Sequence, residues 1–184
     1  ISDGHDNIMT KGGGGSGISD GYGFGLGAVR SDTGVLAGEL AFASRNGSNG
    51  RDDSCWVNNI FLNDNEWHHV AFTNNGGYPN MAFYIDGQRR TGISCNKADG
   101  CADVQSGYSF YLGAQPNMTR QYFAGILDEV TVSNEVKSAD EILQTYQVGR
   151  RTHPITIDFA SSLNTADIKG TSEANALADS SFVL

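Results

Sequence analysis

The residues that most evidently could take part in catalysis or metal binding are two adjacent histidines, His68 and His69. A histidine pair suggests a general base or a metal site, because imidazole titrates near neutral pH and binds metals. Residues 65–73 alternate in the manner of a β-strand, so the two side chains leave the backbone on opposite faces and cannot converge on one site. We therefore expect His68 to be a hydrogen-bonded core or rim residue. No Gly-x-Ser-x-Gly elbow offers a nucleophile elsewhere in the chain.

A carboxylate on a predicted strand indicates a second kind of chemistry. Residues 123–133 alternate, and Asp128 shares its face with Ile126, Val130 and Val132. An inward carboxylate is costly unless it is paired or bound to a cation. Two partners stay open, namely backbone N–H groups of a neighbouring loop or a structural Ca²⁺ ion, which needs several oxygen ligands. The other candidate calcium ligands are Asp3, Asp6, Asp52 and Asp53.

Aromatic side chains on predicted loops indicate a third possibility, sugar binding. Stacking on a sugar needs exposed aromatic faces, and the sugar hydroxyl groups need planar polar side chains. For each aromatic residue, packing in the core or at the rim is the alternative. The candidate ligand-binding residues are Trp56, Tyr78, Tyr122, Asn49, Asn117 and Arg120.

The chain has three cysteines, Cys55, Cys95 and Cys101. Cys95 and Cys101 enclose a short turn-forming loop that can bring their Cβ atoms within bridging distance. We expect a disulfide between Cys95 and Cys101, with Cys55 bonded to either of them as the alternative. Zinc is not indicated, because neither a CxxC motif nor a histidine pair at metal spacing accompanies the cysteines.

Composition restricts the class of protein. The chain has 184 residues, of which 24 are glycine, and a formal net charge of -9. The glycine content favours a turn-rich, all-β protein. The acidic balance argues against nucleic acid as a partner, since phosphate binding needs clustered Lys and Arg. It suits divalent cations or neutral sugars better, and no apolar run approaches the ~20 residues of a membrane span.

The elements that position these residues are mostly strands. Residues 65–73 and 81–88 form an antiparallel pair joined by a turn at 74–80, where Asn, Gly and Pro reverse the chain. Ser138 and Glu141 form a capping box that opens a short helix. The helix runs through about Tyr146 and docks Ile142, Leu143 and Tyr146 on the strands. Further strands are predicted at 8–11, 22–29, 36–43, 55–57, 60–62, 108–114 and 123–133, with a long polar loop at 44–54.

In this order the motifs resemble the concanavalin A-like, laminin-G-like jelly-roll superfamily over about residues 5–147. The strings that carry the resemblance include Glu-Trp-His-His-Val-Ala-Phe-Thr, Phe-Tyr-Ile-Asp-Gly-Gln, Phe-Ala-Gly-Ile-Leu-Asp-Glu-Val-Thr-Val-Ser and Ser-Ala-Asp-Glu-Ile-Leu-Gln-Thr-Tyr. The resemblance implies an all-β fold: a two-sheet antiparallel jelly-roll sandwich with one short C-terminal helix. It also implies an extracellular or cell-surface module, often with a rim Ca²⁺ ion, whose partners are glycans or surface proteins.

The related glucanases carry a Glu-x-Asp-x-x-Glu string on one strand face, which supplies the nucleophile and the acid/base for cleaving a glycosidic bond. This chain has no such string, so we expect no enzyme. The primary expectation is a non-catalytic carbohydrate-binding or adhesion module. The alternative is a structural subunit or spacer domain of a cell-surface or filamentous assembly.

The chain departs from the family pattern at both ends. Members usually begin with strands that have no counterpart before Ile8, so we expect residues 1–148 to form a sandwich that lacks its usual N-terminal strands. Residues 149–184 are expected to be a linker and tail. They either begin a further module or donate a strand, because Ile155, Ile157 and Phe159 alternate. A donated strand implies self-association by strand addition or pairing with the open edge of its own domain.

Overall fold

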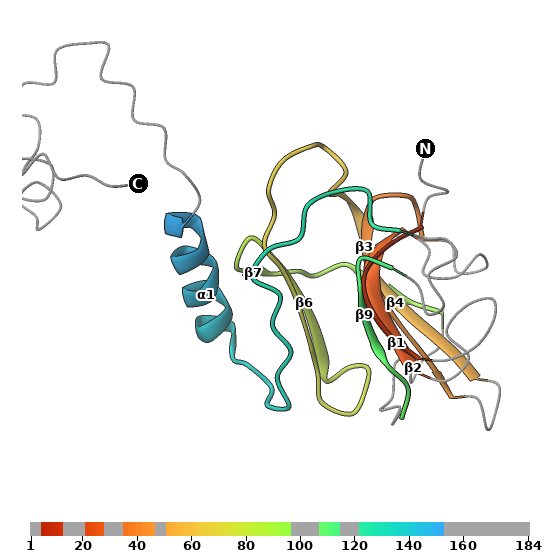
Figure 1. Ribbon diagram of the computed structural model, residues 1–184. Coiled ribbons are helices and arrows are strands. Elements are labelled where there is room, and N and C mark those ends of the chain that lie inside the picture. Colours follow the sequence, from red (N-terminus) through yellow and green to blue (C-terminus); the bar gives the residue numbers. More distant parts are fainter. Residues whose placement is uncertain are drawn as a thin grey trace, which may run out of the picture. The chain divides into compact units, whose positions relative to one another are not determined.

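The computed structural model describes residues 5–12, 21–27, 35–46, 51–96, 107–114 and 122–152. Backbone contacts divide the chain into two units, Ile1–Tyr146 and Gln147–Leu184, and each is described by itself. In the first unit the described strands form two antiparallel sheets (Figure 1). This confirms the predicted two-sheet antiparallel sandwich. Of the second unit the described residues are 147–152, which are helical.

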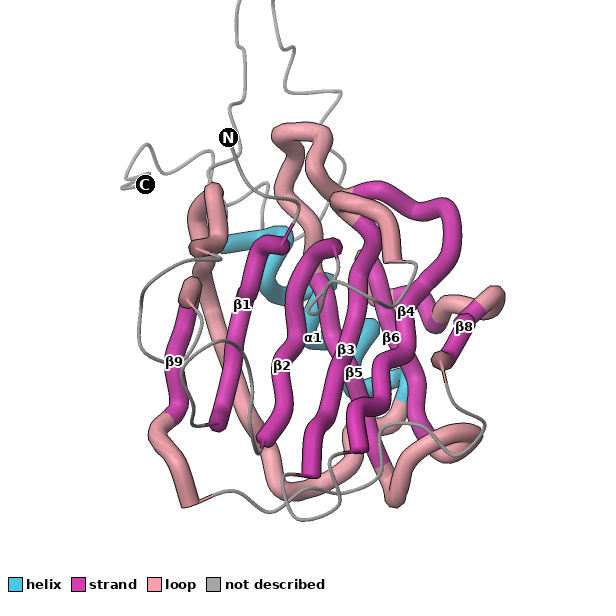
Figure 2. The backbone as a smooth tube through the Cα atoms, turned by 90° about the vertical axis from the view of Figure 1, so that its right-hand side faces the viewer, coloured by secondary structure: helices cyan, strands magenta, loops and turns pink. Residues whose placement is uncertain are grey.

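The larger sheet has six strands in the order β8-β4-β3-β2-β1-β9, and every neighbouring pair is antiparallel. Figure 2 views it from its outer side, with the helix behind it. Its strands are β1 (His5–Gly12), β2 (Gly21–Gly27), β3 (Glu39–Asn46), β4 (Arg51–Phe61), β8 (Ile93–Cys95) and β9 (Phe110–Leu112).

The smaller sheet has three strands in the order β5-β6-β7. These are β5 (Val70–Asn74), β6 (Met81–Ile85) and β7 (Gln88–Arg89). All five residues of β6 are buried, because Met81, Phe83 and Ile85 belong to the core between the sheets. The alternate residues Ala82 and Tyr84 face the helix on the other side.

The core between the sheets is built from alternate residues of the facing strands. Phe42 of β3 stacks on Phe72 of β5 with their ring centroids 4.0 Å apart, and Phe72 contacts Phe83 of β6 at 4.9 Å. Phe24 of β2 and Val57 of β4 complete this face of the larger sheet. The core residues of these strands are spaced by two, because successive side chains of a strand point to opposite faces.

The helix α1 (Ala139–Thr152) begins at the predicted capping box. The Ser138 backbone N–H donates to Glu141 Oε2 at 2.8 Å, and the Glu141 N–H donates to Ser138 Oγ at 3.3 Å. Ile142 packs against β6, and a Cβ added at Gly87 would meet side chains of Leu143 and Tyr146. The cap and the docking face are confirmed, although α1 extends past Tyr146. The predicted boundary between residues 148 and 149 stays a prediction.

Several strand predictions are wrong in their bounds. The strand predicted at 65–73 begins only at Val70. Residues 51–54 belong to β4 rather than to a polar loop, and Leu36 is exposed ahead of β3. In residues 123–133 the structure has no strand. The backbone of Glu129 has a φ of 49°, a left-handed conformation that interrupts an extended chain.

Candidate functional site

The outer face of the six-stranded sheet carries two transverse rows of side chains. In the first row the strand registers align Trp56 with Ala41, Ala41 with Gly25, and Gly25 with Asn7. Asn7 in turn forms an isolated parallel bridge with Tyr122. Phe123 packs against the core, so strand alternation directs Tyr122 to the outer side. Trp56 and Tyr122, two of the predicted ligand-binding residues, thus lie on one row of one face.

The second row runs parallel to the first, one pleat along the strands. It aligns Ser54 with Ala43, Ala43 with Gly23, Gly23 with Thr10, and Thr10 with Tyr111. The Thr10 hydroxyl donates to the Ala114 carbonyl oxygen at 2.8 Å, which fixes the chain after β9 over this margin. Both rows therefore have glycine and alanine in the middle and larger side chains at the margins.

The middle of the outer face is packed rather than open. Val35, which precedes β3, forms a small cluster with Ala41 and Ala43, and the partly buried Trp56 packs against it. Beside Trp56, the Asn58 side-chain amide donates to Ser94 Oγ at 2.9 Å and to the Gly92 carbonyl oxygen at 2.5 Å. The features this face offers to a ligand are aromatic side chains at two margins with polar groups beside them. Such a face suits stacking on sugars.

The other predicted ligand-binding residues do not join this face. Tyr78 is exposed, but it lies in the loop between β5 and β6 of the smaller sheet. Asn49, Asn117 and Arg120 lie outside the described residues, so their placement stays a prediction.

The described residues do not assemble the predicted calcium ligands. Asp6 pairs with Leu26 on β2, whereas Asp53 pairs with Ser44 on β3 near the opposite end of the sheet. Two strands, β2 and β3, lie between β1 and β4, so three strand spacings separate β1 from β4, or roughly 14 Å. Within the described residues no group of three His, Cys, Asp or Glu side chains is placed to hold a metal ion. Asp3 is outside those residues and only the backbone of Asp52 is described.

The prediction that Asp128 faces inward is wrong. Its side chain is exposed, and its Oδ1 atom accepts a hydrogen bond from the next backbone N–H, that of Glu129, at 2.8 Å. The buried carboxylates are instead Glu39 and Asp53. Glu39 is satisfied by the backbone, because its two oxygens accept from the N–H groups of Leu36 and Asn59 at 2.9 and 2.7 Å. The alternation rule did not predict the side of Asp128 correctly, because residues 123–133 do not form a strand of a sheet.

The predicted Cys95–Cys101 disulfide is also wrong. Cys95 is bonded to Cys55 with an Sγ–Sγ distance of 2.09 Å, which is one of the alternatives left open by the sequence. Cys55 and Cys95 are direct partners in the pairing of β4 with β8. Directly opposite residues of an antiparallel pair bring their Cβ atoms close together. The register between β4 and β8 therefore determines which cysteines are bonded. The spacing of the cysteines along the sequence does not reveal this register. Cys101 lies outside the described residues.

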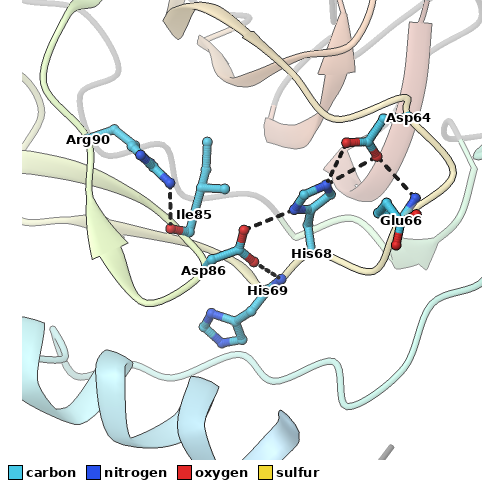
Figure 3. A network of polar contacts seen from close by, with 7 residues as sticks. All are labelled: Asp64, Glu66, His68, His69, Ile85, Asp86 and Arg90. Carbon is cyan, nitrogen blue, oxygen red and sulfur yellow. Dashed lines mark hydrogen bonds and ion pairs between the residues drawn. The ribbon is translucent and has the colours of Figure 1, made fainter.

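The two histidines directly precede β5 and have separate surroundings (Figure 3). His68 Nδ1 lies 3.0 Å from Asp86 Oδ2, and Nε2 lies 3.2 Å from each carboxylate oxygen of Asp64. Carboxylates only accept hydrogen bonds, so both ring nitrogens donate at once only when the imidazole is protonated. We call Asp64, His68 and Asp86 the histidine clamp. It joins the loop before β5 to the turn after β6 and confirms His68 as a hydrogen-bonded residue.

The electrostatics of the clamp follow from its geometry. Burial lowers the pKa of His68, but the hydrogen bonds and negative charges of Asp86 and Asp64 outweigh burial and raise this pKa above its ordinary value. The backbone N–H of Glu66, followed by His68, lowers the pKa of Asp64. Because both nitrogens of His68 are engaged by carboxylates, neither is available to act as a base on a substrate.

His69 faces away from the clamp toward α1. Its ring centroid lies 5.9 Å from that of Tyr146, and its Nδ1 atom is buried with no hydrogen-bond partner among the described residues. Burial lowers the pKa of His69, and the charges of Asp86 and Glu129 offset this only in part. The expectation that adjacent histidines diverge is confirmed.

Sequence reasoning missed the two carboxylates of the clamp, although both left a signal. Val70 pairs with Ile85, so the next residues outward, His69 and Asp86, come opposite each other. Asp86 Oδ1 accepts the His69 backbone N–H at 3.1 Å. Asp64 precedes His68 by four residues, a spacing that a tight loop can close.

Two antiparallel sheets packed face to face, with one short helix, are consistent with a jelly-roll sandwich. A family model described as the concanavalin A-like lectin/glucanases superfamily (Laminin_G_3) matches residues 2–143, and the chain belongs to this family. Searches of curated proteins and of solved structures gave no significant match.

Membership in this family suggests a carbohydrate-binding or adhesion module, and domains of this kind are generally non-catalytic. Laminin G-like domains are typically extracellular, and the Cys55–Cys95 disulfide is the kind of bond that persists in oxidising compartments. No helix within the described ranges is long and apolar enough to cross a membrane.

Proposed function

We propose that this chain is a non-catalytic, extracellular or cell-surface module that binds glycans across the outer face of its six-stranded sheet. The observation that carries the proposal is the register that sets Trp56 and Tyr122 on one transverse row. Four strand spacings separate them, or roughly 19 Å. A single sugar cannot touch both, so the ligand is an extended chain that lies across the strands.

Three further features support the proposal. Tyr122 is exposed, and Trp56 is held at the other margin by its contact with the cluster of Val35, Ala41 and Ala43. Aromatic rings held in this way stack on the C–H faces of sugars at little entropic cost. The net charge of -9 disfavours anionic partners and leaves neutral glycans as the natural class.

An array of defined oligosaccharides and polysaccharides tests the proposal. The strongest ligand is then titrated against Tyr122→Ala and Trp56→Ala, with Tyr78→Ala on the smaller sheet as the matched aromatic control. Loss of a stacking residue is expected to cost about 1–2 kcal/mol, or five- to thirty-fold in Kd. Tyr122→Ala is decisive because an exposed side chain leaves the fold intact. Equal losses in all three variants, or an array without any binding, would reject the proposed face.

The proposal includes a possible structural Ca²⁺ ion, which the same experiment tests. The array is run with Ca²⁺ and again with EDTA, and thermal unfolding is followed under both conditions. If the ion is part of the module, EDTA lowers both the binding signal and Tm, since an ion bound only to the folded state stabilises it. Identical results in both conditions reject the calcium site and leave the aromatic face to stand by itself.

A role as a structural subunit of a surface assembly is the second candidate. The observation that favours it is a run of exposed apolar side chains between Tyr122 and α1, which no glycan requires. A silent array together with concentration-dependent assembly would favour this role over glycan binding. The donated strand predicted at residues 155–159 lies outside the described residues and stays a prediction.

A further inference from the structure

The margin of the outer face at β4 and β8 has uncharged polar side chains beside Trp56. Ser94 of β8 is the direct partner of Trp56 in the sheet, and Asn58 lies two residues further along β4 (Figure 2). Ile93 and Cys95 pack against the core, so alternation directs the Ser94 side chain to the outer face. We call Trp56, Asn58 and Ser94 the margin cluster.

The side-chain amide of Asn58 is held in one orientation. Its Nδ2 atom donates to Ser94 Oγ at 2.9 Å and to the Gly92 carbonyl oxygen at 2.5 Å. The Asn58 backbone N–H donates to the same carbonyl oxygen at 3.1 Å. A carbonyl oxygen only accepts hydrogen bonds, so the amide nitrogen, and not the amide oxygen, faces Gly92. Both N–H groups of the amide are therefore used within the protein.

The hydrogen-bonding capacity that remains in the margin cluster is one acceptor and one donor. The Oδ1 atom of Asn58 has two lone pairs and can only accept. The Ser94 hydroxyl accepts from Asn58, so its own O–H is left to donate. A ligand at this margin therefore meets an acceptor and a donor on neighbouring side chains, next to the aromatic ring of Trp56.

The margin cluster lies at the surface of the protein. The hydrogen bond from Asn58 to Gly92 is exposed, and the space where a Cβ of Gly92 would stand is open. Trp56 and Ser94 are each partly exposed. Because the Asn58 amide is already oriented by its own hydrogen bonds, a ligand loses little free energy in ordering it.

We propose that Asn58 and Ser94 select the sugar at the Trp56 end of the glycan by binding two adjacent hydroxyl groups of a neutral sugar. One hydroxyl donates to Asn58 Oδ1 and its neighbour accepts from the Ser94 O–H, while the sugar ring stacks on Trp56. The cluster holds no charge, which suits a neutral sugar rather than an anionic one. This assignment rests on the glycan face proposed above and adds the specificity of one end of it.

Deoxygenated ligands test the pair directly. The oligosaccharide that binds most strongly on the array, and its monodeoxy derivatives, are titrated against the wild type, Asn58→Ala and Ser94→Ala. Each substitution is expected to raise the Kd for the parent oligosaccharide about three- to tenfold, the loss of one hydrogen bond. The wild type should show a similar loss for the two derivatives that lack one of the adjacent hydroxyl groups. Each variant should bind the parent and one of these derivatives equally well, because the protein partner of that hydroxyl is already gone.

Asn80→Ala is the matched amide control, because Asn80 is exposed in the loop between β5 and β6 of the smaller sheet. It should keep the wild-type Kd and selectivity. Ser94→Ala keeps the bond from Asn58 to Gly92, so it tests the pair even where Asn58→Ala destabilises β8. Wild-type selectivity in both variants, with binding still lost in Trp56→Ala, would overturn the hydroxyl pair and leave the glycan face intact. An array without any binding would overturn both.

Discussion

Two regions of this chain have the same sequence pattern and different structures. The predicted strands at 65–73 and 81–88 and the predicted strand at 123–133 all alternate bulky side chains with small or polar ones. In the first region β5 and β6 pair over five residues, from Val70 with Ile85 to Asn74 with Met81. In the second, the backbone contacts include the bridge from Tyr122 to Asn7 and the hydrogen bond from the Phe123 N–H to the Gly113 carbonyl oxygen, and residues 123–133 form no strand.

The difference shows that an alternating sequence is able to form a strand. Whether it does so depends on an adjacent strand with which it can pair. β6 has β5 and β7 at its edges, the core on one face and α1 on the other. Residues 123–133 reach the core through Phe123 and Leu127. Sheet stability resides in cross-strand contacts and burial rather than in the strand itself. Substitutions in the two regions should therefore have very different costs.

The largest contrast is expected between Phe83 and Val132. Phe83→Ala empties a fully buried core position and should cost about 3–5 kcal/mol of unfolding free energy. Val132→Ala removes an exposed side chain and should stay within about 0.5 kcal/mol of the wild type. Urea unfolding of dilute, monomeric protein measures both. Should Phe83→Ala prevent folding, Phe83→Leu supplies a milder loss of about 1 kcal/mol. Comparable losses at positions 83 and 132 would contradict the contrast.

A smaller contrast is expected between two aspartates. Asp86 accepts hydrogen bonds from His68 and from the His69 backbone, and its left-handed φ of 54° is tolerated by asparagine. Asp86→Asn removes the charge that faces His68 and should cost about 1–2 kcal/mol. Asp128→Asn is the matched control, because that exposed carboxylate accepts only the next backbone N–H and should change stability by less than about 0.5 kcal/mol. The clamp loses its role if the two variants unfold at the same urea concentration.

The same comparison shows what the sequence can and cannot predict. The antiparallel pairing of β5 with β6 and the capped helix followed from alternation and a capping box, since both are local rules with strong physical causes. The two-sheet arrangement followed from the family resemblance. The Cys55–Cys95 bond, the alignment of Trp56 with Tyr122 and the exposure of Asp128 depend on register between strands far apart in the chain. The register between strands is fixed only when the sheet assembles, so it cannot be predicted from the sequence of one strand.

The smallest expected effect is a pH dependence that belongs to the paired region. The folded-state pKa of His68 is raised, so its contribution to stability is complete below its unfolded pKa of about 6.5 and is lost as the pH rises through the folded value. The pKa of His69 is lowered by burial, so its contribution is present above about pH 6.5 and is lost as the pH falls toward its folded value. Together the two histidines produce a shallow maximum of stability near pH 6.5.

Urea unfolding between pH 5 and pH 8 measures the free energy of unfolding on both sides of this maximum. On the acid limb, below the maximum, and on the alkaline limb, above it, the free energy should fall by about 0.5 kcal/mol, because both groups are partly exposed. His68→Gln should remove the loss of stability above pH 6.5 and leave the acid limb unchanged. His69→Gln should remove the acid limb alone. Val136→Ala, at an exposed position outside β5 and β6, should keep the shape of the wild-type curve. If His68→Gln flattened the stability loss at acid pH instead, the clamp would not hold a charged imidazole, and a neutral ring could donate a hydrogen bond to only one of the two carboxylates.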